Sequence, residues 1–141
     1  MKLALKTTWL SALRSHFYKQ GQKELYTQQN NSYCCMGVLA SEMGASFDLA
    51  DPISRRLFHI EDVEYTPDAE TMDIRERFVS FKPASLEDIG LTISQQSVLM
   101  EMNDAGYSFS YIADWIERNV DIDDEEEECR LSIAALQPLA I

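Results

Sequence analysis

The sequence LMEMNDAGYSFSYIADWIERNV, residues 99–120, carries the strongest local structural signal in the chain. Asn103, Asp104 and Gly106 tolerate the left-handed backbone conformation that ends a helix, and Ser108 can cap a second helix by accepting a backbone hydrogen bond. Beyond Ser108, apolar residues recur at spacings of three or four and form one helical face. The segment therefore predicts two helices joined by a sharp turn. The residues of the apolar face are Phe109, Ile112, Ala113 and Ile116.

Length and composition limit the class of protein. The chain has 141 residues, 45% of them hydrophobic, which is enough for one domain, 1–141, with an apolar core. Twelve basic and 24 acidic residues give a net charge of −12, which disfavours bulk attraction to a nucleic acid backbone. No apolar run approaches the roughly 18 to 20 residues of a membrane span. Lys6, Arg14 and His16 interrupt any secretion signal, so we expect a cytoplasmic protein whose partners are small or locally recognised.

Neither the cysteines nor the acidic run predicts a metal site. Three cysteines, two of them adjacent at Cys34 and Cys35, lack the pairing of a disulfide framework and the neighbours of a four-ligand zinc site. We expect them to be reduced and mostly buried. The acidic run 121–128 lacks the glycine and the spaced ligands of a calcium loop.

Helical periodicity is present in four segments of the chain. We expect Thr7 or Thr8 to cap the first helix, Gly21 to stop it, and Phe17 to lie on its apolar face. A shorter helical turn is expected to begin at Ser85. The four predicted helices span residues 8–19, 34–43, 94–104 and 109–119.

The central region changes from helical to strand periodicity. Residues 56–60 and 77–81 alternate between apolar and polar side chains, as half-buried strands do. We therefore expect a small antiparallel sheet among the four helices, which is an α+β fold. The tail is predicted to be an acidic linker, 121–128, followed by an apolar segment, 129–141, that docks on the domain or on a second subunit.

Four of the 12 basic residues are arginines of the predicted sheet region, where several phenylalanines also lie. Guanidinium groups bind phosphates bidentately and stack on adenine or aromatic rings, so this combination can hold a nucleotide without a basic overall surface. Pairing with surface carboxylates is the alternative. Arg75 and Arg77 share one strand parity, which predicts that both point to one face and Glu76 and Phe78 to the other. The four arginines are Arg55, Arg56, Arg75 and Arg77.

DNA binding and catalysis both receive little support from the residues. A helix-turn-helix unit is a second interpretation of residues 99–120, but Asp114 and Glu117 share the exposed side of the second helix with only Arg118. This charge pattern favours a hairpin that forms part of the core. Neither histidine has the local support of a catalytic group, and the single glycines form no phosphate-binding loop. We therefore do not expect an enzyme.

Three motifs, in this order, resemble a family of small phage and prophage proteins. They are WLSALRS at residues 9–15, YCCMGVL at residues 33–39 and MNDAGYSFSYIADWIE at residues 102–117. Residues 16–17 stand where the family has a glycine after the first motif, and Met36 stands where leucine is usual. The family is similar to the Thoeris anti-defence sponges, phage proteins that sequester cyclic ADP-ribose signals made by bacterial TIR enzymes.

The resemblance implies a phage-encoded anti-defence protein that binds a host immune signalling nucleotide, of the cyclic ADP-ribose or cyclic oligonucleotide type, without cleaving it. It also implies a homo-oligomer in the bacterial host cytoplasm that needs no cofactor or metal, with Asn103 as a ligand contact. Two other classes stay open: an acidic inhibitor that mimics DNA and blocks a nuclease, and a helix-turn-helix-like regulator. The chemical candidates for phosphate binding or base stacking are Arg14, Arg55, Arg56, Arg75, Arg77 and Arg118.

Overall fold

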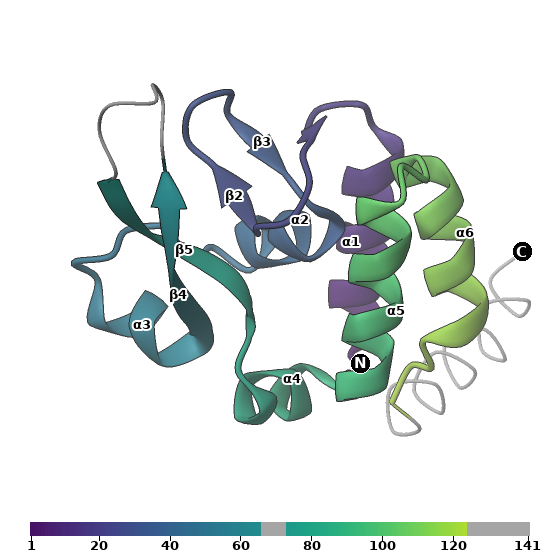
Figure 1. Ribbon diagram of the computed structural model, residues 1–141. Coiled ribbons are helices and arrows are strands. Elements are labelled where there is room, and N and C mark those ends of the chain that lie inside the picture. Colours follow the sequence, from purple (N-terminus) through teal and green to yellow (C-terminus); the bar gives the residue numbers. More distant parts are fainter. Residues whose placement is uncertain (66–72, 124–141) are drawn as a thin grey trace, which may run out of the picture.

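The computed structural model describes residues 1–65 and 73–123, and within them six helices and two small sheets (Figure 1). The predicted α+β class is confirmed, and helices are present in all four predicted segments. The helical turn expected at Ser85 belongs to α4, and α3 is an additional short helix. In chain order the elements are α1 (Leu3–Arg14), β1 (Lys19–Gln20), β2 (Tyr26–Thr27), β3 (Ser32–Tyr33), α2 (Cys35–Glu42), α3 (Pro52–Leu57), β4 (Phe58–Tyr65), β5 (Asp73–Phe81), α4 (Pro83–Ile89), α5 (Ile93–Asp104) and α6 (Phe109–Asn119).

The hairpin of α5 and α6 forms as its sequence predicts. Thr92 and Gln95 make a reciprocal capping box at the start of α5, and Gly106 has a φ of 93° in the turn after it. The Ser108 hydroxyl accepts a hydrogen bond of 3.2 Å from the Tyr111 N–H, which caps α6. The four apolar residues of the predicted α6 face are all buried, so this face is part of the core.

Ile112→Ala tests how much the α6 face contributes to stability. Ile112 is completely buried, and removing three of its side-chain carbons leaves a cavity beneath α1 and α5, so we expect unfolding free energy to fall by about 2 to 4 kcal/mol. Urea denaturation of wild type and variant measures the difference. The exposed Ser110 on the same helix provides the control, since Ser110→Ala should change stability by less than about 0.5 kcal/mol. Equal stability of all three proteins would contradict a core role for this face.

Helix α1 differs from its prediction at both ends. It begins at Leu3, after Lys2, so Thr7 and Thr8 lie inside the helix and cap nothing. The Lys6 ammonium donates to the carbonyl oxygens of Glu117 and Val120 at the end of α6, a contact 111 or more residues away in sequence that favours the earlier start.

The exit from α1 was also predicted wrongly. The helix ends at Arg14 because the Ser15 hydroxyl donates to the Ala12 carbonyl oxygen at 2.8 Å and His16 turns the chain with a φ of 62°, so Gly21 does not end it. Phe17 therefore leaves the helical face and is 83% exposed, contrary to prediction.

Two small sheets form separately. Strand β3 lies between β1, which is parallel to it, and β2, which is antiparallel. Strands β4 and β5 form the predicted antiparallel pair, with a register shift between His59 and Ile60. The strand predicted at residues 56–60 begins only at Phe58. Arg56 and Leu57 belong instead to α3, because the Asp51 carboxylate accepts a hydrogen bond from the Ile53 N–H and Pro52 occupies the first helical turn.

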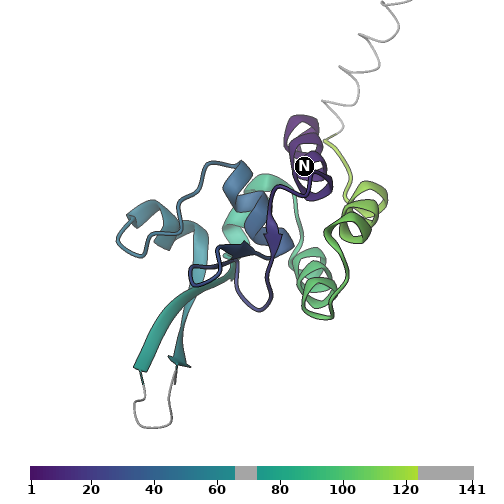
Figure 2. The same ribbon diagram turned by 90° about the horizontal axis from the view of Figure 1, so that it is seen from above.

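The two views show how the elements are arranged. Helices α1, α5 and α6 lie together at one end, α2 lies beside α1 and α5, and the β4–β5 ribbon leads away from the helices (Figures 1 and 2). A chain of aromatic rings joins the ribbon to the body, with Phe47 stacked on Phe58 at a centroid distance of 5.7 Å. Among the residues described, no helix has the length and apolar character needed to cross a membrane.

The buried cysteines behave as the sequence predicts. Cys34 and Cys35 are free thiols in the core, and burial raises the pKa of Cys34 to about 12, so its thiol stays protonated. The acidic run beyond Asp123 and the apolar segment 129–141 lie outside the described residues. Their predicted roles as linker and docking segment, and the predicted homo-oligomer, therefore stay predictions.

Candidate functional site

The seven candidate ligand-binding residues do not share one pocket. Arg55, Arg75 and Arg77 gather at one cavity beside β5. Arg56 is exposed on α3. Asn103 is completely buried at the end of α5, which separates it from the arginines it was expected to join.

The remaining two arginines lie on the α1–α6 surface. Arg14 Nη2 is 2.8 Å from the Asp114 carboxylate and 2.8 Å from the Glu117 carboxylate. Hydrogen bonds to Glu117 and then Asp114 raise the pKa of Arg14 above its ordinary value. Arg118 Nε donates to the carbonyl oxygen of Asp114, on its own helix, at 3.3 Å. The Arg14 contacts match the alternative of carboxylate pairing. Arg118 instead bonds to a backbone carbonyl oxygen, and the depression that it lines with Tyr111 also holds the carboxylates of Asp114 and Glu117, which repel a phosphate.

The same surface bears on DNA binding by α6. Two of its exposed groups are the carboxylates of Asp114 and Glu117, which repel nucleic acid phosphates, and Tyr107 stacks on Tyr111 at 4.7 Å beside them. The hairpin therefore serves packing, and a regulator reading DNA through α6 gains no support from its geometry.

The arginine cavity is a depression of about 490 Å³ between β5, β2 and the chain that leads into α3. Its wall combines guanidinium groups, carboxylates and aromatic rings. Arg55 lies at its border, where its Nε donates to the Leu49 carbonyl oxygen and its Nη2 is 3.1 Å from the Glu76 carboxylate. The lining residues are Glu24, Tyr26, Gln28, Phe47, Asp48, Leu49, Arg75, Glu76, Arg77 and Phe78.

Arg75 and Arg77 point to one face of β5, as their parity predicts. Both reach the carboxylate of Glu24, which is only 5% exposed. The distances from Arg75 Nη2 to the two carboxylate oxygens are 3.4 and 3.5 Å, and that from Arg77 Nη1 to Oε2 is 3.7 Å. Glu76 and Phe78, which were predicted to point to the other face, also line the cavity, where Phe78 contacts Phe47 and Glu76 contacts Arg55.

The aromatic part of the cavity offers a flat apolar surface. Tyr26 stacks on Phe47 with centroids 5.3 Å apart and an interplanar angle of 25°, and Phe47 meets Phe78 edge to face at 5.6 Å. The Tyr26 hydroxyl donates to Asn31, so the ring is held in place from its far end. A planar base could lie against such a surface while phosphates approach the guanidinium groups.

The lining residues carry two guanidinium groups, of Arg75 and Arg77, and three carboxylates, of Glu24, Asp48 and Glu76. Arg55, at the border of the cavity, adds a third positive charge through its contact with Glu76, and only with Arg55 counted do the charges balance. In a chain with a net charge of −12, this region is less unfavourable for an anion than the acidic average.

Asn103 positions the loop that carries Glu24. Its side-chain Nδ2 donates to the Gly21 carbonyl oxygen at 2.7 Å, while its Oδ1 accepts from the Cys35 N–H and the Gln20 amide, each at 3.1 Å. The neighbouring Asp104 carboxylate accepts from the Lys23 N–H at 2.8 Å. Asn103 and Asp104, which are adjacent in the third motif, thus bind residues 20–23 to the end of α5.

Six lining residues were missed by sequence reasoning: Glu24, Tyr26, Gln28, Phe47, Asp48 and Leu49. Glu24, Tyr26 and Phe47 lie in polar or irregular segments where no periodicity marks them. Glu24 is 51 residues from Arg75, so only the folded chain brings the carboxylate to the guanidinium. The one available signal was the presence of Leu25 and Tyr26 as apolar residues within an otherwise polar stretch.

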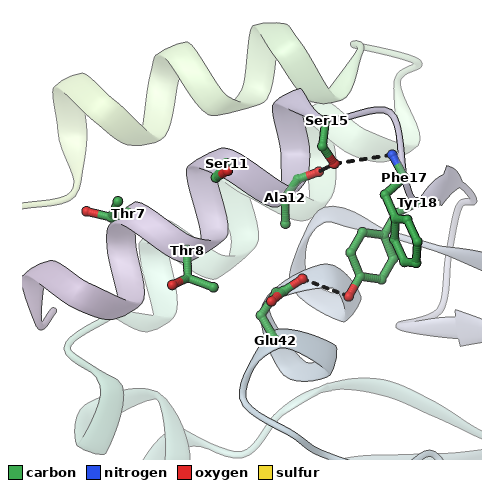
Figure 3. A pocket seen from close by; sticks show the side chains of 8 residues that line it. All are labelled: Thr7, Thr8, Ser11, Ala12, Ser15, Phe17, Tyr18 and Glu42. Atoms are coloured by element: carbon green, nitrogen blue, oxygen red, sulfur yellow. Dashed lines mark hydrogen bonds between the residues drawn. The ribbon is translucent and has the colours of Figure 1, made fainter.

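A second cavity, of about 520 Å³, lies between α1 and the end of α2 (Figure 3). Hydroxyl groups and one carboxylate dominate it, with the Tyr18 hydroxyl donating to Glu42 at 2.9 Å and exposed Phe17 at its edge. Burial and the Glu42 carboxylate raise the pKa of Tyr18. This cavity does not suit a phosphorylated ligand, because its lining residues include no basic side chain. The lining residues are Thr7, Thr8, Ser11, Ala12, Ser15, Phe17, Tyr18 and Glu42.

The fold and the site define an α+β domain with an arginine-lined cavity beside a two-stranded ribbon. The family model described as Domain of unknown function (DUF8296) matches residues 1–120, and the chain belongs to this family. No curated protein and no solved structure matches the chain. Among the residues described, no group of three or more metal-ligating side chains occurs.

Proposed function

We propose that the protein binds a small phosphorylated nucleotide in the arginine cavity and holds it without cleaving it. The observation that carries the proposal is the placement of Arg75 and Arg77 side by side on one face of β5, next to the Tyr26–Phe47 stack. Two guanidinium groups can bind the oxygens of a diphosphate, and an aromatic stack can receive a base. A volume of about 490 Å³ is within the usual range for small-molecule sites.

The identity of the ligand is proposed from the motif resemblance. The three motifs resemble a phage protein family that is similar to sponges of cyclic ADP-ribose signals. We therefore propose a nucleotide of this type, or a cyclic oligonucleotide, as the ligand. The biological role would be a phage-encoded anti-defence protein that acts in the bacterial host cytoplasm by stoichiometric capture. Such a role needs an affinity high enough to compete with the host effector and no catalytic group.

Arg77→Lys tests the site most directly. Lysine keeps the charge but removes the planar fork, so we expect affinity to fall by roughly tenfold or more, which corresponds to about 1.4 kcal/mol. Calorimetric titration with cyclic ADP-ribose isomers measures the change. Arg118→Lys, on the α6 surface, is the matched control and should bind as wild type does.

Two results would count against this site. Equal affinity of wild type and Arg77→Lys would remove the arginine cavity as the binding site. Absence of binding by wild type to any cyclic ADP-ribose isomer or cyclic oligonucleotide would remove nucleotide capture as the function.

An acidic inhibitor that binds a nuclease is the second candidate, and the net charge of −12 favours it. The two functions differ in their response to salt. Binding through an extended charged surface weakens steeply as ionic strength rises, whereas a nucleotide held partly by stacking loses less affinity. Titrating the protein at two salt concentrations, with the nucleotide and separately with a candidate nuclease, separates the two functions.

A further inference from the structure

Glu24 is a buried carboxylate that holds two guanidinium groups at unusually long distances. Hydrogen bonds between charged groups normally have donor–acceptor distances of about 2.7 to 2.9 Å. Here the three distances from the Arg75 and Arg77 terminal nitrogens to the Glu24 oxygens are 3.4, 3.5 and 3.7 Å. One carboxylate is shared between two guanidinium groups and is optimally placed for neither.

Arg77 also retains an unused donor. Its Nε is buried and has no hydrogen-bond partner among the described residues. An N–H group withheld from water and left without an acceptor is unfavourable, and a larger oxyanion in the cavity would supply the acceptor. Arg77 therefore has more hydrogen-bonding capacity than Glu24 uses.

Hydrogen bonds hold the backbone on both sides of Glu24. On one side the Lys23 N–H donates to Asp104 at 2.8 Å. On the other the Leu25 N–H donates to the Phe78 carbonyl oxygen at 2.9 Å, and the Leu25 carbonyl oxygen accepts from the Cys34 N–H at 3.2 Å. A displacement of the carboxylate from the arginines would therefore be a rotation of the side chain, with the neighbouring backbone hydrogen bonds intact.

We propose that Glu24 is a displaceable counter-ion: it neutralises Arg75 and Arg77 in the empty protein, and a phosphoryl group of the ligand takes its place. This inference rests on the proposed nucleotide function and adds how the empty site is kept stable and what limits affinity. Moving a carboxylate away from two arginines, and its repulsion with the arriving phosphate, both make the free energy of ligand binding less favourable. The wild-type affinity is therefore lower than the arginine pair alone would give.

Glu24→Gln removes the competing charge and should tighten anion binding. With inorganic pyrophosphate as the probe, we expect at least about a tenfold lower dissociation constant than in wild type, measured by calorimetry. The matched control is Glu76→Gln, which removes one negative charge from the same cavity but contacts Arg55 instead of the arginine pair. Its dissociation constant should change by less than about threefold, as expected for a partly exposed charge.

Thermal unfolding supplies a second measurement. Without anion, Glu24→Gln should melt below wild type, because Arg75 and Arg77 lose their contacts with the Glu24 carboxylate. Pyrophosphate should raise the melting temperature of Glu24→Gln more than that of wild type or Glu76→Gln. If Glu24→Gln fails to fold, Glu24→Asp replaces it: the shorter side chain keeps the charge but draws it back from Arg77, and tighter pyrophosphate binding is again expected.

The outcomes separate the two proposals. Nucleotide binding by wild type that is unchanged or weaker in Glu24→Gln and Glu24→Asp would overturn the displacement while leaving nucleotide capture intact. Tighter pyrophosphate binding by the Glu24 variants, with no nucleotide bound by any protein, would support the displacement and overturn nucleotide capture. A lower melting temperature for Glu24→Gln that pyrophosphate does not restore would make Glu24 a structural counter-ion only and would overturn the displacement.

Discussion

Asn103→Ala is expected to lower the unfolding free energy by about 3 to 5 kcal/mol, although the residue lies in the last turn of α5. The side chain is completely buried and makes three hydrogen bonds, to Gly21, Cys35 and Gln20. Its removal leaves the Cys35 N–H without an acceptor inside the protein and the Gly21 carbonyl oxygen without its amide donor. Each unsatisfied buried group costs about 1 to 3 kcal/mol.

Urea denaturation with circular dichroism measures this loss. Asn119→Ala is the control, because the exposed Asn119 amide donates only to the Trp115 carbonyl oxygen of its own helix. Its effect should stay below about 1 kcal/mol. If Asn103→Ala were as stable as wild type and lost only nucleotide binding, Asn103 would be a ligand contact, as the motif resemblance implies, and its assignment here as a positioning residue would be wrong.

Gly37→Ala is expected to have the second large effect, because α2 passes against the loop that carries Glu24. A Cβ atom at Gly37 would lie 1.8 Å from the Leu25 carbonyl oxygen and 2.7 Å from its carbonyl carbon. The clashing atoms belong to the backbone of Leu25, whose N–H and carbonyl groups are hydrogen-bonded to Phe78 and Cys34. Relieving the clash would therefore break these hydrogen bonds or shift α2. We expect the loss of unfolding free energy to exceed about 3 kcal/mol.

The control for Gly37→Ala is Gly106→Ala. Gly106 has a positive φ, but nothing lies within 4 Å of the position of an added Cβ atom, so this variant reports backbone strain without a clash. Its cost should be about 1 to 2 kcal/mol. Equal melting temperatures for the two variants would show that α2 and Leu25 are less closely packed than described.

The sequence predicted the parts of the fold whose signals are local. The α5–α6 hairpin has its cap, its turn glycine and its apolar period within a single stretch, and all three agree. Helix α1 was misplaced at both ends, for different reasons. Its earlier start accompanies a contact of Lys6 with α6, more than 100 residues away, which the segment alone does not contain. Its stop at Ser15 and His16 is local, but neither residue is a common helix terminator, and Gly21 was chosen instead.

The candidate site was predictable to the same extent. Strand parity places Arg75 and Arg77 on one face, because side chains alternate along any strand. The carboxylate between them, and the positions of Arg14 and Asn103 away from the cavity, depend on partners 51 to 103 residues distant. A count of arginines in the sequence could not distinguish those with surface carboxylate partners from those at a cavity.

The loop from Gly21 to Leu25 has one further consequence. It is bonded to the end of α5 through Asn103 and Asp104, and to β5 through Leu25 and Phe78. A two-stranded ribbon on its own is only marginally stable in water, so the β4–β5 pair depends on this attachment to the helices. We therefore expect the ribbon and the helical end to unfold in one cooperative event, so that a destabilising substitution in the α5–α6 hairpin also disrupts the arginine cavity without changing any residue that lines it.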